Sequence, residues 1–233
     1  MHTNHCCSSA DVSQFAIISD RQRKIKMAII SKKLVPDVAL IDPVITTTMN
    51  SNMTVYTRFD ILSHSIEAYV SNASSPITDV HSIEAIKLFS SNILPCIKDP
   101  KNPKFRGNLM LASLHAGLAF SNASFGLVHA MAHSLGGLMD LPHGECNALL
   151  LEHVVNFNYS SDPARYLKIS QCMGVVDSTD KYGLINAISQ LKIKTGVTQT
   201  LKEIGVQEND IPQLAQKTMN DPCIVTNPVT KKE

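Results

Sequence analysis

The stretch that decides the fold of this chain reads Gly126-Leu-Val-His129-Ala-Met-Ala-His133-Ser-Leu-Gly-Gly-Leu-Met-Asp-Leu-Pro-His143-Gly-Glu-Cys-Asn147-Ala-Leu-Leu. Its apolar and small residues predict two helices, near residues 126–139 and 144–157. His129 and His133 stand four residues apart, which puts both imidazoles on one face of the first helix. His143 follows ten residues later, just past the expected end of that helix. The stretch therefore predicts a helical fold that gathers three histidines.

A second polar pair with the same spacing lies upstream, in Asp60-Ile-Leu-Ser-His64. On a helix, this carboxylate and this imidazole can converge on one point. A carboxylate with several neutral imidazoles and no thiolate suits Fe²⁺ or Zn²⁺ better than Ca²⁺ or Mg²⁺. The residues alone leave alternatives open, because a histidine in a buried helix is more often a hydrogen-bonded core residue than a ligand. They also do not separate His129 from His133 as the ligand.

Helical patterns continue beyond these segments. Ser75-Pro76 is typical of a helix start, with a capping serine before a proline at the first helical position. Residues 106–121 are apolar on nearly every side, which predicts a fully buried helix. Further helices are expected near residues 163–173, 181–195 and 208–219. The remaining histidines are expected to be structural or surface residues: His2, His5, His81, His115 and His153.

The first 45 residues follow a different pattern. Phe15-Ala-Ile-Ile18 and Ile25-Lys-Met-Ala-Ile-Ile30 flank a polar turn, which predicts a β-hairpin. Asp37-Val-Ala-Leu-Ile41 is a short apolar run that we expect to be a buried strand. No glycine precedes Gly107, so this part lacks the glycine turn that holds the pyrophosphate of a dinucleotide. We therefore divide the chain into a β part, residues 1–45, and a helical metal-binding domain, residues 46–233.

Composition excludes several classes of function. The chain has 233 residues and a net charge of +1, without a basic cluster large enough for nucleic-acid binding. The longest apolar run, residues 109–120, contains a serine and a histidine and is too short to span a bilayer. The six cysteines form no CxxC pair, so we expect neither a disulfide framework nor a thiolate metal site. With no apolar signal core at the N-terminus, a place in the reducing cytoplasm is expected.

Two of these segments resemble a known family. Asp60-Ile-Leu-Ser-His64-Ser-Ile-Glu-Ala-Tyr69-Val is similar to the segment MDALTHAIEAYV of iron-containing (group III) alcohol dehydrogenases. Residues 126–150 are similar to the family's signature GLVHAMAHPLGGxYxxPHGxANAxLL, and the resemblance extends to Pro36–Pro43 and Asn220–Pro228. It implies a mainly α fold. This would be a helical, dehydroquinate synthase-like C-terminal domain, preceded by a hairpin and strand left from a nucleotide-binding domain.

The resemblance also implies roles for single residues. His133 would lie near the nicotinamide and the substrate and assist proton transfer, and Lys26 would lie close to the cofactor, NAD(P). The implied reaction interconverts small primary alcohols and aldehydes, and the metal, Fe²⁺ or alternatively Zn²⁺, lowers the pKa of the alcohol hydroxyl. The implied metal ligands are Asp60, His64, His129 and His143.

The chain departs from the family pattern at several places. The nucleotide-binding domain with its Gly-Gly-Gly-Ser turn is missing, and the family loop TxGTxSEVT is replaced by residues 5–13. Arg58 stands where the family has glycine, so we expect it to crowd the pocket; Ser134 replaces a proline and Met139 an aromatic residue. Three interpretations follow: a truncated dehydrogenase, one half of a split enzyme with a separate nucleotide-binding partner, or a non-catalytic metal-binding remnant. The apolar hairpin, left uncovered, predicts a homo-oligomer.

Overall fold

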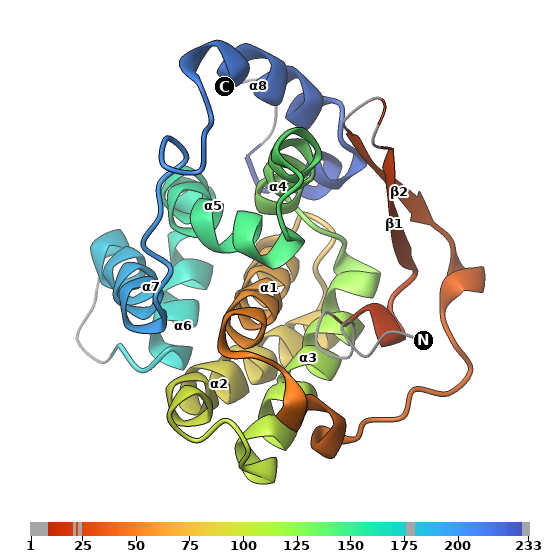
Figure 1. Ribbon diagram of the computed structural model, residues 1–233, viewed down its shortest axis with the longest axis vertical. Coiled ribbons are helices and arrows are strands. Elements are labelled where there is room, and N and C mark those ends of the chain that lie inside the picture. The colour runs from red at the N-terminus through yellow and green to blue at the C-terminus, as the bar shows by residue number, and fades with distance from the viewer. Residues whose placement is uncertain (1–8, 21, 23–24, 176–179, 230–233) are drawn as a thin grey trace.

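The computed structural model describes residues 9–20, 22, 25–175 and 180–229. Figure 1 shows a body of helices with one two-stranded hairpin along its side, which confirms the mainly α fold. The helices are α1 Ser51–Val70, α2 Pro76–Lys98, α3 Pro103–Ala123, α4 Leu127–Met139, α5 His143–Asn158, α6 Pro163–Cys172, α7 Lys181–Thr195 and α8 Ile211–Met219. The strands are β1 Phe15–Asp20 and β2 Ile25–Ile30. Short 3₁₀ turns are Ala10–Val12, Lys32–Leu34, Pro43–Thr48, Tyr159–Ser161, Glu208–Asp210 and Pro222–Thr226.

The helices begin at capping residues that the sequence supplies. Ser75 caps α2 as predicted, and it forms a reciprocal capping box with Thr78 while Pro76 takes the first helical position. Asn50 caps α1 by accepting a hydrogen bond from the backbone N–H of Met53. These caps satisfy backbone donors that the first helical turn leaves without partners.

Helix α1 lies at the centre of the body and packs against α2, α3 and α5 (Figure 1). From Arg58 to Val70 every residue of α1 is buried, so polar side chains in this segment are held inside the protein. Such groups need partners there, because an unpaired buried polar group costs free energy. Helix α3 is less enclosed than predicted. Leu111 is 42% exposed, because one side of α3 remains uncovered by its neighbours.

The predicted hairpin is confirmed, with Phe15 opposite Ile30 and Ile18 opposite Met27 in antiparallel register. Strand β2 packs against α4, while Ile18 and Ile29 remain 48% and 46% exposed. The buried strand predicted at residues 37–41 is wrong. In the described part of the chain only β1 and β2 form strands, and Val38 and Leu40 are 82% and 88% exposed. An apolar run needs a neighbouring strand to become part of a sheet.

The segment before the hairpin is fixed to α3. Ser9 donates its hydroxyl hydrogen to the carbonyl of Ser113 at 2.6 Å, and Ser121 accepts from the backbone N–H of Gln14 at 3.1 Å. A Cβ atom at Gly117 would overlap the side chain of Val12, so glycine permits this close approach. Among the described residues, no single helix has the length and hydropathy to cross a membrane; only α3 and α4 taken together do, with a bend of 101° between them.

Candidate metal centre

Four residues from three helices point their donor atoms at one place. One donor atom each of Asp60, His64, His129 and His143 lies within 4.8 Å of the others. The Nε2 atoms of His64, His143 and His129 are 3.4, 3.6 and 3.8 Å from Oδ1 of Asp60. Two donors bound at about 2.1 Å to one tetrahedral metal ion are separated by about 3.4 Å. The cluster therefore fits a divalent ion with small adjustments of the side chains.

The helices explain why these side chains meet. Asp60 and His64 are one turn apart on α1, as predicted, while His129 comes from α4 and His143 is the first residue of α5. The start of α5 approaches α1 closely at Gly144, where a Cβ atom would overlap the backbone of Tyr56. Glycine at this position thus allows His143 to reach the residues of α1. His143 is also the most open of the four, with 29% of its side chain exposed, against 5% or less for the others.

Glu67 bonds to the imidazole of His129 on the side that faces away from Asp60. Its Oε2 atom lies 2.5 Å from Nδ1 of His129, and its Oε1 atom accepts a hydrogen bond from the backbone N–H of Val128. The bond keeps a proton on Nδ1 of His129, so in the neutral imidazole the lone pair is on Nε2, which faces Asp60. A Cβ atom at Gly126 would lie 2.9 Å from Oε1 of Glu67, so glycine makes room for this carboxylate.

Asn147 and two phenylalanines complete the surroundings. The amide of Asn147 donates a hydrogen bond of 2.6 Å to Oδ1 of Asp60. The ring of His64 stacks on that of His129, with centroids 4.7 Å apart, and packs against Phe120 at 4.3 Å and Phe125 at 5.3 Å. Ring packing therefore orients His64, whereas a carboxylate orients His129.

The charges within the cluster favour a cation. Burial acts to raise the pKa of Asp60, but the imidazoles of His64 and His143 hold this carboxyl well below its usual range, so it is ionised. Burial lowers the pKa of His64 to about 3, against the opposing effect of Asp60, so its imidazole is neutral at neutral pH and one ring nitrogen has a free lone pair. Burial opposes protonation of His129 as well, but Glu67 and Asp60 raise the pKa of this imidazole to about 9. The site thus attracts positive charge to the position between these groups.

His133 lies beside the cluster without pointing its bonded nitrogen at it. Its Nδ1 atom is 2.9 Å from Oδ2 of Asp221, and its ring stacks on that of His143 with centroids 5.2 Å apart. Burial acts to raise the pKa of Asp221, but the hydrogen bond with His133 keeps this carboxyl below its usual value. The structure thus gives His129 and His133, which their sequence spacing could not separate, different surroundings.

Sequence reasoning missed Glu67, Asn147 and Asp221 as functional neighbours. Glu67 follows Asp60 by seven residues, which places both on one face of α1, so helical periodicity offered a signal. Asn147 and Asp221 stood inside the segments that resemble the family, but no local rule relates Asp221 to a histidine 88 positions away. Their importance depends on how the helices cross.

Other predicted positions lie elsewhere. Lys26 is in β2, opposite Ser19, and its side chain is not described. Of the segment 5–13, residues 5–8 lie outside the described residues. Arg58 does not crowd the cluster. It lies two residues before Asp60, on the other side of the helix. Its positive charge is near Cys96 in α2, where it partly offsets the rise that burial causes in the pKa of the thiol. Ser134, in place of the family's proline, donates a hydrogen bond to the carbonyl of Leu214 in α8.

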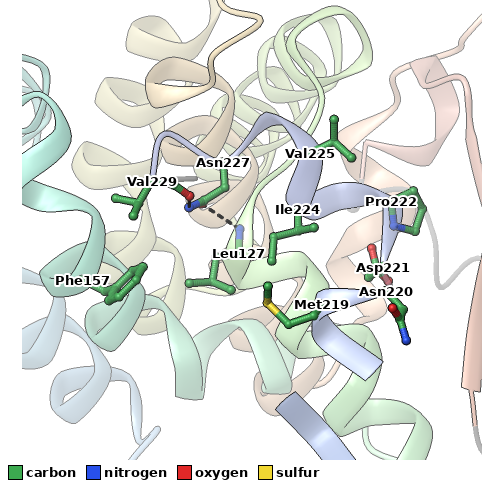
Figure 2. Close-up of a pocket in the computed structure, with 10 residues that line it drawn as sticks. All are labelled: Leu127, Phe157, Met219, Asn220, Asp221, Pro222, Ile224, Val225, Asn227 and Val229. Carbon is green, nitrogen blue, oxygen red and sulfur yellow. Dashed lines mark hydrogen bonds between the residues drawn. The ribbon is translucent and has the colours of Figure 1, made fainter. Parts of the chain in front are cut away.

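A cavity of about 770 Å³ opens next to this region but includes none of the four clustered residues. Figure 2 shows that Leu127 and the turn Pro222–Thr226 line it, with the backbone N–H of Leu127 bonded to Asn227. Asp221 also lines the cavity and bonds to His133, so this carboxylate lies between the cavity and the histidines. The walls are otherwise largely apolar (Figure 2).

Comparisons with known proteins agree with this architecture. Residues 54–233 match the Fe-containing alcohol dehydrogenase family, C-terminal. The chain is 36% identical over 228 residues to a 1,3-propanediol dehydrogenase of Citrobacter freundii, and 41% identical over 224 residues to alcohol dehydrogenase 4 of Saccharomyces cerevisiae. Each alignment covers 95% of this chain but 58% of the relative, so the chain spans little more than half the length of these proteins.

A solved structure shows the same fold. The crystal structure of a 1,3-propanediol oxidoreductase superposes with a TM-score of 0.92 at 34% sequence identity, covering 97% of this chain and 60% of the other. Together with the match over residues 54–233, this shows that the chain belongs to the iron-containing alcohol dehydrogenase family.

Proposed function

We propose that this chain supplies the metal-binding part of a nicotinamide-dependent dehydrogenase that interconverts primary alcohols and aldehydes. The observation that carries the proposal is the convergence of four donor atoms within 4.8 Å. The ligands would be Asp60, His64, His129 and His143, and the ion Fe²⁺, with Zn²⁺ as the alternative. A bound divalent ion lowers the pKa of an alcohol hydroxyl and, in the reverse reaction, polarises an aldehyde carbonyl.

The chain's own residues would prepare this site in two ways. Asp60 contributes one full negative charge, which Asn147 stabilises through its hydrogen bond. Phe120, Phe125 and the stacked imidazoles exclude water from the buried side. The more exposed His143 marks the open side, from which an alcohol would approach. Exclusion of water lowers the local dielectric constant, which strengthens the electrostatic interactions within the site.

His133 would accept and pass on the hydroxyl proton. Because Asp221 accepts a hydrogen bond from Nδ1, the Nε2 atom of His133 is left unprotonated and able to take a proton. Oδ1 of Asp221 also accepts a hydrogen bond of 2.8 Å from the backbone N–H of Cys223, which fixes the position of this carboxylate. In this arrangement His133 is the catalytic residue and Asp221 a positioning residue.

The nicotinamide cofactor, NAD(P), would lie near Lys26 and His133. In this proposal residues 1–45 belong to the nucleotide-binding part and residues 46–233 form the metal-binding domain. The alternative of one half of a split dehydrogenase draws support from the hairpin. Its exposed Ile18, Met27 and Ile29 lie on one face of the hairpin and form an apolar surface that a nucleotide-binding partner, or a second copy of the chain, would cover.

Elemental analysis of protein purified without oxygen tests the metal site first. We expect one metal ion per wild-type chain at this site and its loss in His143→Ala. The matched control is His153→Ala, because His153 lies on the same helix with 71% of its side chain exposed. Equal metal content in wild type and His143→Ala would exclude His143 as a ligand.

Formation of NADH from a primary alcohol tests the reaction itself. With metal bound and cofactor in excess, NADH formation that His133→Ala abolishes would support the enzyme. A metal-loaded chain that forms no NADH, alone or with the nucleotide-binding part of a relative added, would instead establish the non-catalytic metal-binding remnant.

A further inference from the structure

A second pair of histidines faces each other across two helices outside the site described above. His81 of α2 and His115 of α3 have their Nδ1 atoms 3.0 Å apart and their ring centroids 5.2 Å apart. Both residues are partly buried, so solvent reaches part of each ring. These histidines were expected to be structural or surface residues, and they are 34 positions apart in the sequence.

The separation of these nitrogens matches that of two ligands on one metal ion. Two imidazole nitrogens bound at about 2.1 Å and at a right angle to each other are about 3.0 Å apart. Without an ion, one Nδ1–H donates to the other Nδ1, which also holds the nitrogens at this distance. An ion would replace that shared proton, and each ring would rotate so that the lone pair of its Nδ1 atom points at the ion.

The charges around the pair also suit a cation. Burial, together with the neighbouring His81, lowers the pKa of His115, so its ring is neutral and able to bind a metal at neutral pH. Glu84 lies three residues after His81, on the same face of α2. Its carboxylate favours the protonated form of His115 and so partly offsets the fall in the pKa of this imidazole. A bound divalent ion would therefore have two neutral nitrogen ligands and one negative charge nearby.

We propose that His81 and His115 form a second metal site, which takes a transition-metal ion such as Ni²⁺, Cu²⁺ or Zn²⁺ and links α2 to α3. Imidazole ligands select these ions over Ca²⁺ and Mg²⁺. The site shares no ligand with the Asp60 cluster, so it can be occupied whether or not that cluster holds iron. Water would complete the coordination on the exposed side.

Equilibrium dialysis of the full chain against Ni²⁺, followed by elemental analysis, tests the site. We expect His81→Ala and His115→Ala each to bind one fewer nickel ion per chain than wild type. His153→Ala, which removes an exposed histidine on α5, is expected to match wild type. Wild-type nickel content in both His81→Ala and His115→Ala would overturn the proposal and leave a plain hydrogen bond between the rings.

Two further experiments separate loss of the metal site from loss of the hydrogen bond between the rings, and from nickel binding at the Asp60 cluster. His81→Gln retains a group that can hydrogen-bond to His115 but cannot chelate a cation with it, so a folded His81→Gln chain is still expected to lose one ion. Measured in a His143→Ala background, the loss caused by His115→Ala is expected to remain one ion. A loss that disappears in that background would place the nickel at the Asp60 cluster and refute the second site.

Discussion

The Oε2 atom of Glu67 lies 2.5 Å from Nδ1 of His129, so a carboxylate outside the clustered four fixes the direction of one of their imidazoles. Both oxygens of Glu67 accept hydrogen bonds, one from His129 and one from the backbone N–H of Val128. Because each oxygen of Glu67 faces an N–H group, a hydrogen-bond donor in place of either oxygen would lose its partner. Glu67 therefore orients His129 without being one of the four clustered residues.

Glu67→Gln is therefore expected to weaken metal binding by about 10- to 100-fold, the usual effect of losing such an outer hydrogen bond. The amide –NH₂ of glutamine would face either His129 or Val128, and both are donors. Competition with a coloured chelator measures the affinity. Glu152→Gln is the control, because Glu152 pairs with Lys192 at 3.3 Å, away from the cluster. Unchanged affinity in Glu67→Gln would show that His129 needs no fixed tautomer.

Asp221→Ala is expected to change the tautomer of His133 without changing the metal content. Removing the acceptor leaves no carboxylate to keep the proton on Nδ1, so the Nε2–H form should gain population. The ¹⁵N chemical shifts of the two ring nitrogens report the change directly, whether or not the chain is active. If the Nδ1–H form still dominates in Asp221→Ala, another group holds the ring and Asp221 is not a positioning residue.

Arg58→Met is expected to stabilise the fold. The side chain of Arg58 is 0% exposed, and none of its three guanidinium nitrogens has a hydrogen-bond partner among the described residues. Replacing a buried charge by an apolar side chain of similar length should raise the free energy of unfolding by about 1–4 kcal/mol. Urea unfolding at pH 7 measures it.

The matched control for Arg58 is another arginine with partners. Arg165 donates from Nε to the carbonyl of Tyr69 at 2.8 Å and pairs with Asp79. Arg165→Met should therefore lower the stability, opposite in sign to Arg58→Met. A loss of stability in both variants would mean that Arg58 has a partner in solution.

Gly144→Ala is expected to loosen the metal centre and to lower stability by about 1–3 kcal/mol, because the added methyl overlaps the backbone of Tyr56 and pushes α5 away from α1. Metal content and thermal unfolding measure the two effects. Gly107→Ala is the control in another helix. Its new methyl would meet only Pro43 at an ordinary 3.8 Å, so a small gain in stability is expected. Equal behaviour of both variants would contradict the close approach at Gly144.

Local sequence rules predicted what depends on neighbours along the chain. Ser75-Pro76 predicted the start of α2, and the four-residue spacing of Asp60 and His64 placed both on one face, because caps and helical periodicity act within a few residues. The strand expected at 37–41 was wrong, since a strand requires a partner that local sequence does not contain.

Contacts between helices were harder to predict. The bond between Glu67 and His129, and that between Asp221 and His133, exist only after α1, α4 and the turn Pro222–Thr226 have packed. Arg58 was expected to crowd the pocket because it stands where the family has a glycine, two residues before Asp60. Residues two apart on a helix point to nearly opposite sides, so Arg58 faces away from the cluster. The resemblance to a family supplied the proposed set of four ligands, which the spacing of the histidines left open, and the donor atoms of these residues do lie within 4.8 Å of one another.

The distribution of the four clustered residues along the chain has a consequence for folding kinetics. Asp60 and His143 are 83 positions apart in the sequence, so the cluster cannot assemble until α5 has docked on α1. Contacts of such long range form late, after the loop between them has closed. A metal ion should therefore leave the refolding rate unchanged and slow unfolding. A metal ion that binds at the cluster would enter a chain that is already folded, past His143.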